Sequence, residues 1–200
     1  MPEPYTFRRV SEKDSVSEIA HLIYSADPFL YRDIFGNESD AAMVLSVLLK
    51  EEGNVFSMQN YYVVEEEGKI VGLAALYKNN PQWNEQKIKN AFYHKNIPIP
   101  ESFQSASSYF KETFNYPRVG VNTCNVVVHE DYRMRGIGDY LVKNLIRISG
   151  RSPLELNVLS ENETAIRLYQ KNGFVIVETF MDYGGYQSPP VECYRMFLNK

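Results

Sequence analysis

Hydrophobic and polar residues alternate along this chain with two periods, one typical of helices and one typical of strands. Apolar residues recur at helical spacing in two early segments: Val16, Ile19, Ala20 and Ile23, then Ala41, Val44, Leu45 and Leu48. This spacing predicts two helices after F-R-R-V, with A-D-P-F-L-Y as a turn between them. Residues 60–77 contain two β-rich runs joined at Glu67-Gly68, which predicts an antiparallel hairpin.

The last 80 or so residues alternate between strand and helix. The pattern predicts strands at 119–129, 153–159, 174–180 and 191–198, with helices at 138–148 and 162–171. Strand, helix and strand with short connections indicate parallel pairing and a right-handed crossover. Because 200 residues with 44% hydrophobic content suit one core, we expect a single α/β domain over 1–200, with a central mixed sheet flanked by helices.

Residues 78–116 differ from their surroundings, being polar, amide-rich and aromatic. Phe103, Ala106, Phe110 and Phe114 share a helical face, and I-K-N-A-F-Y-H predicts a shorter helix before it. We interpret 78–116 as a helical insertion between the third and fourth strands, since a structureless loop of this length is unusual. Its aromatic residues either line a substrate pocket or form a small core that holds the insertion: Trp83, Phe92, Tyr93, Phe103, Tyr109, Phe110 and Phe114.

Composition excludes several classes of protein. Two cysteines, Cys124 and Cys193, form no disulfide framework, and with three scattered histidines they give no zinc spacing, so we expect no metal. A formal charge of -4 without a basic patch argues against nucleic acid. The apolar runs are too short to span a membrane and the start lacks a signal-peptide layout, so we expect a cytoplasmic protein.

The stretch R-M-R-G-I-G at 133–138 stands between a predicted strand and a predicted helix. A helix start has unpaired N–H groups and a positive dipole end, and the glycines allow close approach of an anion. The stretch is therefore either a phosphate cradle or an ordinary turn with arginines on a solvated edge. The Walker pattern is absent, and a dinucleotide fingerprint would need glycine where Leu141 stands.

Two motifs resemble signatures of the GNAT N-acetyltransferase superfamily. The pattern [QR]-x-x-G-x-[GA] is met by Arg133, Gly136 and Gly138, after the lead-in H-x-x-Y-R. The pattern N-x-x-A-x-x-L-Y-x-x-x-G-F is met in full: Asn162, Ala165, Leu168, Tyr169, Gly173 and Phe174. The order of the predicted helices and hairpin also follows the family plan, and 78–116 departs from its minimal form.

The resemblance implies a GNAT fold with acetyl-CoA as co-substrate. In this family the fourth strand and its successor splay apart, which implies that backbone groups of Val126, Val127 and Val128 hold the pantetheine arm. The alternative is that these three valines form an ordinary buried strand of the core. The resemblance further implies pyrophosphate contacts from the N–H groups of the turn, which comprises Arg133, Met134, Arg135, Gly136, Ile137, Gly138 and Asp139.

Asn162 and Tyr169 are two helical turns apart and share a face. The resemblance places Asn162 at the pantetheine and Tyr169 near the sulfur, where a tyrosine can act as general acid. The alternative for Tyr169 is a core tyrosine with its hydroxyl bonded at the surface. Ser160 and Glu163 form S-x-x-E, which predicts a capping box.

The general base is left open by the sequence. Its candidates are Glu130, Cys124, Glu65 and Glu66, whereas His129 fits a structural place in the lead-in to the turn. The resemblance implies acetyl transfer to a primary amine of a small molecule or peptide by direct attack. The alternatives are a silent acyl-CoA-binding sensor and, less consistent with Leu141, a dinucleotide-binding protein. The resemblance leaves the acceptor unnamed and admits a homodimer.

Overall fold

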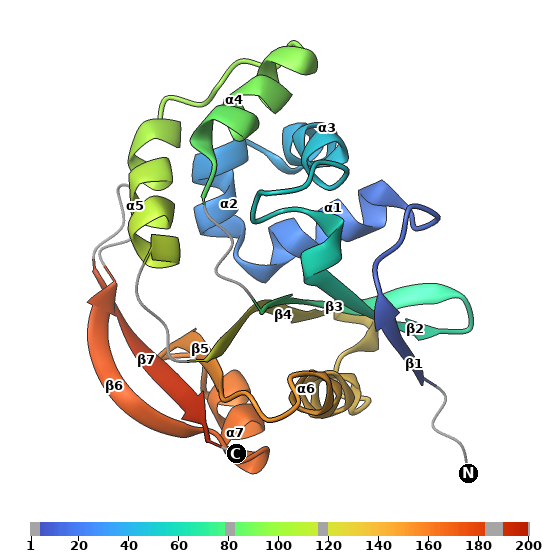
Figure 1. The fold of residues 1–200 in the computed structure, drawn as a ribbon, viewed down its shortest axis with the longest axis vertical. Coiled ribbons are helices and arrows are strands. Elements are labelled where there is room, and N and C mark those ends of the chain that lie inside the picture. Colours follow the sequence, from blue (N-terminus) through green and yellow to red (C-terminus); the bar gives the residue numbers. More distant parts are fainter. Residues whose placement is uncertain (1–4, 79–82, 116–119, 183–189, 200) are drawn as a thin grey trace.

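The computed structural model describes residues 5–78, 83–115, 120–182 and 190–199. Within these residues, seven strands form one mixed sheet in the order β1-β2-β3-β4-β5-β7-β6 (Figure 1). β4 and β5 are parallel, and the other neighbouring strands are antiparallel. The strands are β1 (Tyr5–Arg9), β2 (Tyr61–Glu66), β3 (Lys69–Tyr77), β4 (Val121–Val128), β5 (Leu154–Leu159), β6 (Val175–Asp182) and β7 (Val191–Leu198).

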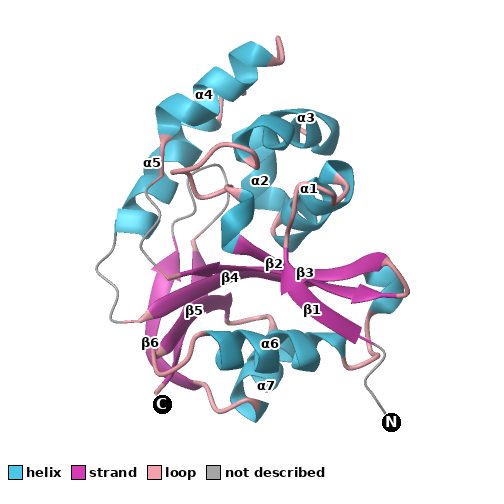
Figure 2. Ribbon diagram, turned by 45° about the vertical axis from the view of Figure 1, so that its right-hand side comes forward, coloured by secondary structure: helices cyan, strands magenta, loops and turns pink. Residues whose placement is uncertain are grey.

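Helices cover both faces of this sheet, as Figure 2 shows. On one face lie α1 (Val16–Ala26), α2 (Pro28–Phe35), α3 (Glu38–Leu48), α4 (Glu85–His94) and α5 (Phe103–Asn115). On the other lie α6 (Ile137–Ile148) and α7 (Glu163–Lys171). Short 3-10 turns occur at Met58–Asn60 and Glu130–Tyr132. Because both faces are covered, β3 is buried from Ile70 to Tyr77 and has a continuous apolar sequence.

The structure confirms the hairpin and most of the expected helices. β2 and β3 pair antiparallel through a turn in which Glu67 and Gly68 both have positive φ, at 50° and 80°. The helices expected from the two early apolar patterns are α1 and α3. In the described part of the chain, no helix has the combination of length and apolar character that a bilayer crossing requires.

The expected turn at A-D-P-F-L-Y is wrong, because this segment begins a helix. Pro28 occupies the first position of α2, where its missing N–H is not needed. Asp27 caps the helix, its Oδ1 accepting a hydrogen bond from the Leu30 N–H at 3.0 Å. The Asp-Pro pair therefore starts α2, and Gly36, with φ of 88°, ends it.

The two helices expected within 78–116 are α4 and α5, which lie between β3 and β4 in the chain. The Trp83 ring stacks on Phe110 at 4.5 Å, and its Nε1 donates to Ser107 Oγ at 2.8 Å. These contacts attach α5 to the aromatic core. Whether 78–116 is an insertion into a shorter family plan stays a prediction, as does the single-domain description of 1–200.

β4 and β5 meet at one end and diverge at the other. Their pairing is confined to Val121 with Leu154 and Asn122 with Glu155, after which β5 pairs with β7 instead. β4 also has a bulge, since its register with β3 shifts and Asn125 has φ of 52°. The sheet therefore opens between β4 and β5 beyond their first residues.

Candidate active site

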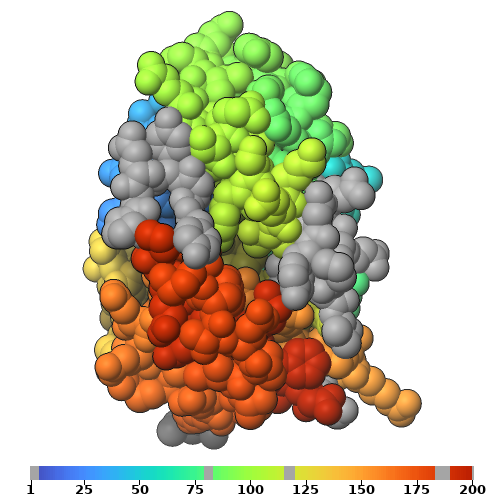
Figure 3. Space-filling view, turned by 90° about the vertical axis from the view of Figure 1, so that its left-hand side faces the viewer, coloured from blue at the N-terminus to red at the C-terminus, as the bar shows by residue number. Residues whose placement is uncertain are grey.

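A cavity of about 440 Å³ lies in the opening between β4 and β5. Its walls come from the start of α2, the last turns of α5, the diverging parts of β4 and β5, and α7, with one residue each from β6 and β7. Figure 3 shows the face on which α5, in yellow-green, lies above β6 and β7, the orange and red strands at one edge of the sheet. This volume is that of a site for a small ligand.

Asn162 and Tyr169 both line this cavity, as expected from their shared helical face. Asn162 caps α7, its Oδ1 accepting from the Ala165 N–H at 3.1 Å. The capping box expected at Ser160 is therefore wrong by two residues. The Ser160 N–H donates to the Glu192 carbonyl at 2.9 Å, and this bond holds Ser160 beside β7, outside the helix.

Tyr169 is 7% exposed, and its ring lies 5.7 Å from that of Phe174. Among the described residues, its hydroxyl has no hydrogen-bond partner. Burial raises the pKa of Tyr169, and the nearby Cys124 raises it further, so the hydroxyl stays protonated at neutral pH. A hydroxyl on a cavity wall that has no partner among the described residues is available to a ligand.

The backbone of β4 presents alternate residues to the opening. The His129 N–H donates to the Val71 carbonyl on β3 at 3.0 Å, so by alternation Val127 also bonds toward β3. Val126 and Val128 therefore direct their backbone groups away from β3, toward the diverging side. Val127 is 8% exposed, and its side chain lies in the core. Its backbone groups face β3, whereas the sequence led us to expect them to face the pantetheine arm.

The turn before α6 lies beside the cavity but does not line it. Met134 and Gly136 have positive φ, at 62° and 83°, and Gly136 is the N-cap residue of α6. No described group accepts a hydrogen bond from the N–H groups of residues 136–139, because the first bond of α6 joins the Tyr140 N–H to the Gly136 carbonyl. This helix start can bind an anion.

The two arginines of the turn hold its backbone in place. Arg133 Nε donates to the Val128 carbonyl at 3.2 Å, and Arg135 donates to the Asp131 carbonyl at 3.2 Å. The guanidinium of Arg135 also lies over the Tyr132 ring at 4.8 Å. Both arginines leave donors exposed, and so can also contact an anion at the helix start. Ile137 is 1% exposed and anchors this turn to the core.

Asp139 joins α6 to α7. Its carboxylate contacts Lys143 at 2.9 Å and Lys171 at 3.0 Å, and accepts from Asn172 Nδ2 at 2.8 Å. The hydrogen bond from Lys143 is the largest cause that lowers the pKa of Asp139, to about 2. The contact helps fix α7, and with it Tyr169, against the anion-binding turn.

We expect the Asp139 contacts to appear in the pH dependence of stability. Because the folded pKa lies below the ordinary 3.8, the stabilisation is complete above about pH 4 and is lost as pH falls toward 2. After allowance for the solvent-exposed lysines, Asp139→Asn is expected to lower the unfolding free energy by about 1 kcal/mol at pH 6. Urea unfolding at several pH values measures this, and a difference between variant and wild type that does not shrink toward pH 2 contradicts it.

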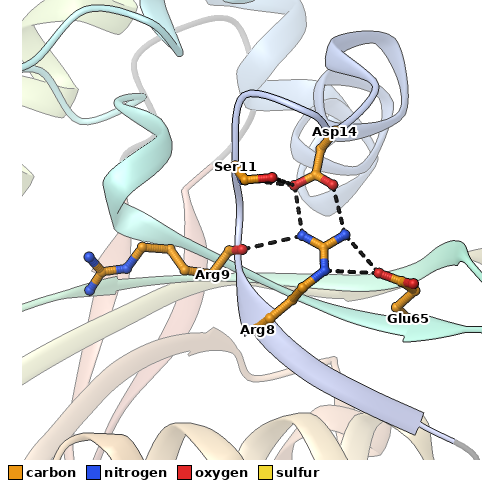
Figure 4. A network of polar contacts seen from close by, with 5 residues as sticks. All are labelled: Arg8, Arg9, Ser11, Asp14 and Glu65. Carbon is orange, nitrogen blue, oxygen red and sulfur yellow. Dashed lines mark hydrogen bonds and ion pairs between the residues drawn. The ribbon is translucent and has the colours of Figure 1, made fainter.

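Of the candidates for a general base, Cys124 lines the cavity. Glu65 is instead bound to Arg8, whose Nε donates to it at 2.9 Å, in the network with Asp14 shown in Figure 4. Glu66 lies 3.6 Å from Arg135. Glu130 and His129 lie in or next to the 3-10 turn that follows β4. Neither is among the described residues that line the cavity.

The structure adds three residues to the cavity that sequence reasoning missed: Asp27, Asp182 and Cys193. Tyr109, Phe110 and Phe114, for which the sequence left a pocket role open, also line it. The Tyr109 hydroxyl donates to Asp182 Oδ2 at 2.5 Å, which joins α5 to the end of β6. The Asp-Pro signal for a helix start would have located Asp27. No local signal identifies Asp182, because its position depends on how β6 crosses the end of α5.

The fold described above is similar to the folds of several solved acetyltransferases. An N-acetyltransferase from Staphylococcus aureus Mu50 has a TM-score of 0.70 at 18% identity, covering 96% of this chain and 100% of that one. Another solved acetyltransferase has a TM-score of 0.69 at 21% identity, over 97% and 98% of the two chains. Spermidine N-acetyltransferase from Vibrio cholerae, solved with CoA and spermine, has a TM-score of 0.62 at 16% identity, over 98% and 95%.

The family follows from the sequence profile. The profile of the acetyltransferase (GNAT) family matches residues 29–174, from α2 to the residue before β6. The chain belongs to this family, which confirms the resemblance drawn from the two motifs. A comparison with curated protein sequences found no match.

Proposed function

We propose that this protein transfers the acetyl group of acetyl-CoA to a primary amine of a small molecule or peptide. The observation that carries the proposal is the opening between β4 and β5, in which Asn162 and Tyr169 face a cavity next to a helix start with free N–H groups. Family membership supports the acetyl donor. A solved structure similar to this one, yncA from Salmonella typhimurium, is described with its cofactor acetyl-CoA.

The residues present fit acetyl-CoA. A pyrophosphate suits the unpaired N–H groups of residues 136–139 together with Arg133 and Arg135. The backbone groups of Val126 and Val128 suit the amides of a pantetheine arm, which would pair with β4 where β5 has diverged. Asn162 uses Oδ1 for the cap and keeps its Nδ2 for a carbonyl of the same arm.

When bound, acetyl-CoA supplies a thioester whose acetyl carbon is attacked by the amine while the sulfur departs with the bonding electron pair. A backbone N–H of Val126 or Val128 donates to the carbonyl oxygen as negative charge develops there. Tyr169 donates its hydroxyl proton to the departing sulfur. The amine loses one proton in the reaction, and Tyr169 takes up one proton again, so that the protons balance.

The experiment that tests this function is release of the CoA thiol from acetyl-CoA, with pooled amines and pooled peptides in separate reactions. Release that depends on one pool supports a transferase and gives the class of its acceptor. Acetyl-CoA binding by calorimetry without release from any pool would overturn the proposal in favour of a silent acyl-CoA sensor. Competition by NAD would instead favour the dinucleotide alternative.

Two further expectations belong with this proposal. Cys124 and Cys193 do not form a disulfide, which is consistent with the cytoplasmic location that we propose. A homodimer is an expectation of the family resemblance, and size-exclusion chromatography with light scattering measures it.

A further inference from the structure

The bulge of β4 changes the direction in which its backbone groups point. Cys124 lies opposite Ala75, and Val127 lies opposite Leu73. β4 therefore has two residues between these pairs where β3 has one, and the first of the two is Asn125, with φ of 52°. An extra residue in a strand reverses, for the residues that follow it, the side to which the backbone N–H and C=O groups point.

This reversal determines which backbone groups of β4 reach the opening. The Ala75 carbonyl points toward β4, since it accepts a hydrogen bond from Thr123 Oγ1 at 2.8 Å. Without the extra residue, Val126 and Val128 would keep the phase of Cys124, which lies opposite Ala75, and would bond toward β3. With the bulge in place, these two valines direct their backbone groups to the opening.

We propose that Asn125 is a positioning residue for the acetyl donor: its side chain, held by Tyr31, keeps the bulge in the conformation that turns Val126 and Val128 toward the opening. The identity of the donor rests on the function proposed above. The conformation of the bulge is a property of the free protein and needs no turnover.

The side chain of Asn125 joins β4 to two other elements. Its Oδ1 accepts from the Tyr31 hydroxyl of α2 at 2.8 Å, and its Nδ2 donates to the Tyr61 hydroxyl of β2 in a longer bond of 3.4 Å. Asparagine also adopts a positive φ more readily than most residues that have a side chain. Asn125 therefore suits the bulge in two ways, through its backbone conformation and through an amide that is bonded to the core.

Tyr31 is a rigid support for this contact. It is 4% exposed, and its ring centre lies 6.1 Å from that of Phe35 and 6.2 Å from those of Phe56 and Phe110. Burial raises the pKa of the Tyr31 hydroxyl, which therefore stays protonated at neutral pH and can donate. Because a closely packed ring has few other positions, its hydroxyl holds the Asn125 amide in one place.

Direct contact with a ligand is the alternative role, because Tyr31 and Asn125 both line the cavity. The two roles predict different results for a double variant. A hydrogen bond that acts through the backbone is lost once, whichever partner is removed, so the two substitutions should not add. Independent contacts of the two side chains with a ligand should add.

The variants are Tyr31→Phe, Asn125→Gly and their combination. Phenylalanine keeps the buried ring and removes the donor, whereas glycine keeps access to a positive φ and removes the amide. Ser107→Ala on α5 is the control, because it also removes a buried side-chain hydrogen bond, the one that Ser107 accepts from Trp83 at 2.8 Å. Ser107 is not among the described residues that line the cavity.

Calorimetric titration of the full chain compares acetyl-CoA with adenosine 3′-phosphate 5′-diphosphate, which has the nucleotide and pyrophosphate of CoA but no pantetheine arm. Tyr31→Phe and Asn125→Gly are each expected to weaken acetyl-CoA binding about three- to tenfold, and the double variant to weaken it no further. Both should bind the nucleotide as the wild type does, because the proposed pyrophosphate site is the start of α6. Ser107→Ala should bind both compounds as the wild type does.

Hydrogen exchange followed by NMR tests the bulge without any ligand. In the wild type, the Val127 N–H, which bonds toward β3, should exchange more slowly than the N–H groups of Val126 and Val128. Tyr31→Phe and Asn125→Gly are expected to reduce this difference about three- to tenfold. Ser107→Ala should preserve it.

The outcomes keep this proposal separate from the proposed function. Unchanged acetyl-CoA affinity in both single variants, additive losses in the double variant, or an unchanged exchange pattern overturns the positioning role even if acetyl transfer occurs. Equal weakening of acetyl-CoA and nucleotide binding indicates general damage to the fold and overturns it as well. If the wild type binds no acetyl-CoA but the variants lose the exchange pattern, Tyr31 and Asn125 still control the bulge, and it is the transferase function that is overturned.

Discussion

Replacing Tyr169 with phenylalanine is expected to lower kcat by about 10²- to 10³-fold and to leave the affinity for acetyl-CoA unchanged. The substitution keeps the ring that packs against Phe174 and removes the hydroxyl that, in the proposed mechanism, protonates the departing thiolate. The hydroxyl has no hydrogen-bond partner among the described residues, so its removal leaves no described protein group unsatisfied. The loss therefore falls on the chemical step.

Steady-state kinetics with the acceptor found by thiol release, and calorimetric binding of acetyl-CoA, measure the two quantities. Tyr140→Phe is the control, since the Tyr140 hydroxyl on α6 donates to the Tyr5 carbonyl at 2.9 Å, outside the cavity. Its loss should reduce stability slightly and leave kcat near that of the wild type. If Tyr169→Phe retains full kcat, the general acid is another group, and if it weakens acetyl-CoA binding instead, Tyr169 has a binding role.

The sequence predicted those parts of the fold that depend on local patterns. The Glu67-Gly68 turn and the crossover from β4 through α6 to β5 follow from residues adjacent in the chain. The same is true of the turn at Gly136, where φ of 83° requires the glycine that the motif supplies. Asn162 and Tyr169 reach one cavity because they are two helical turns apart, a relation visible in the sequence alone.

Tertiary packing determined what the sequence did not predict. A-D-P-F-L-Y contains a proline and an aspartate, which favour turns as strongly as helix starts. The helix is stabilised by an apolar face that includes Ile34 and Phe35, which lie beyond the expected turn. Asp182 has no local motif, and its place on the cavity wall depends on contact with Tyr109, 73 residues earlier. The sequence therefore identified the cavity residues of α7 but not those at the end of β6.

This difference has a physical cause. Acetyl-CoA is recognised through backbone groups, which need glycines and a helix start at fixed spacing and so leave a short motif. The rest of the cavity wall is made of side chains on separate elements: the end of α5, the start of α2 and the end of β6. Such a wall is assembled by packing, so its residues can be identified only after the fold is known.

The aromatic core around Phe35 gives the largest expected effect on stability. Phe35, fully buried at the end of α2, lies 5.4 Å from Phe56, 6.1 Å from Tyr31 and 6.4 Å from Phe92 between ring centres. Phe35→Ala leaves a cavity among these rings and is expected to lower the unfolding free energy by about 3–5 kcal/mol. Since domains of this size have about 5–15 kcal/mol in all, the variant loses a large fraction of its stability.

Urea unfolding followed by tryptophan fluorescence measures this loss, because Trp83 lies 5.9 Å from Phe56 in the same cluster. The control is Phe29→Ala on the same helix, since Phe29 is 72% exposed and its loss should change stability by about 0.5 kcal/mol or less. A similar small effect for both variants would mean that α2 is not packed as described.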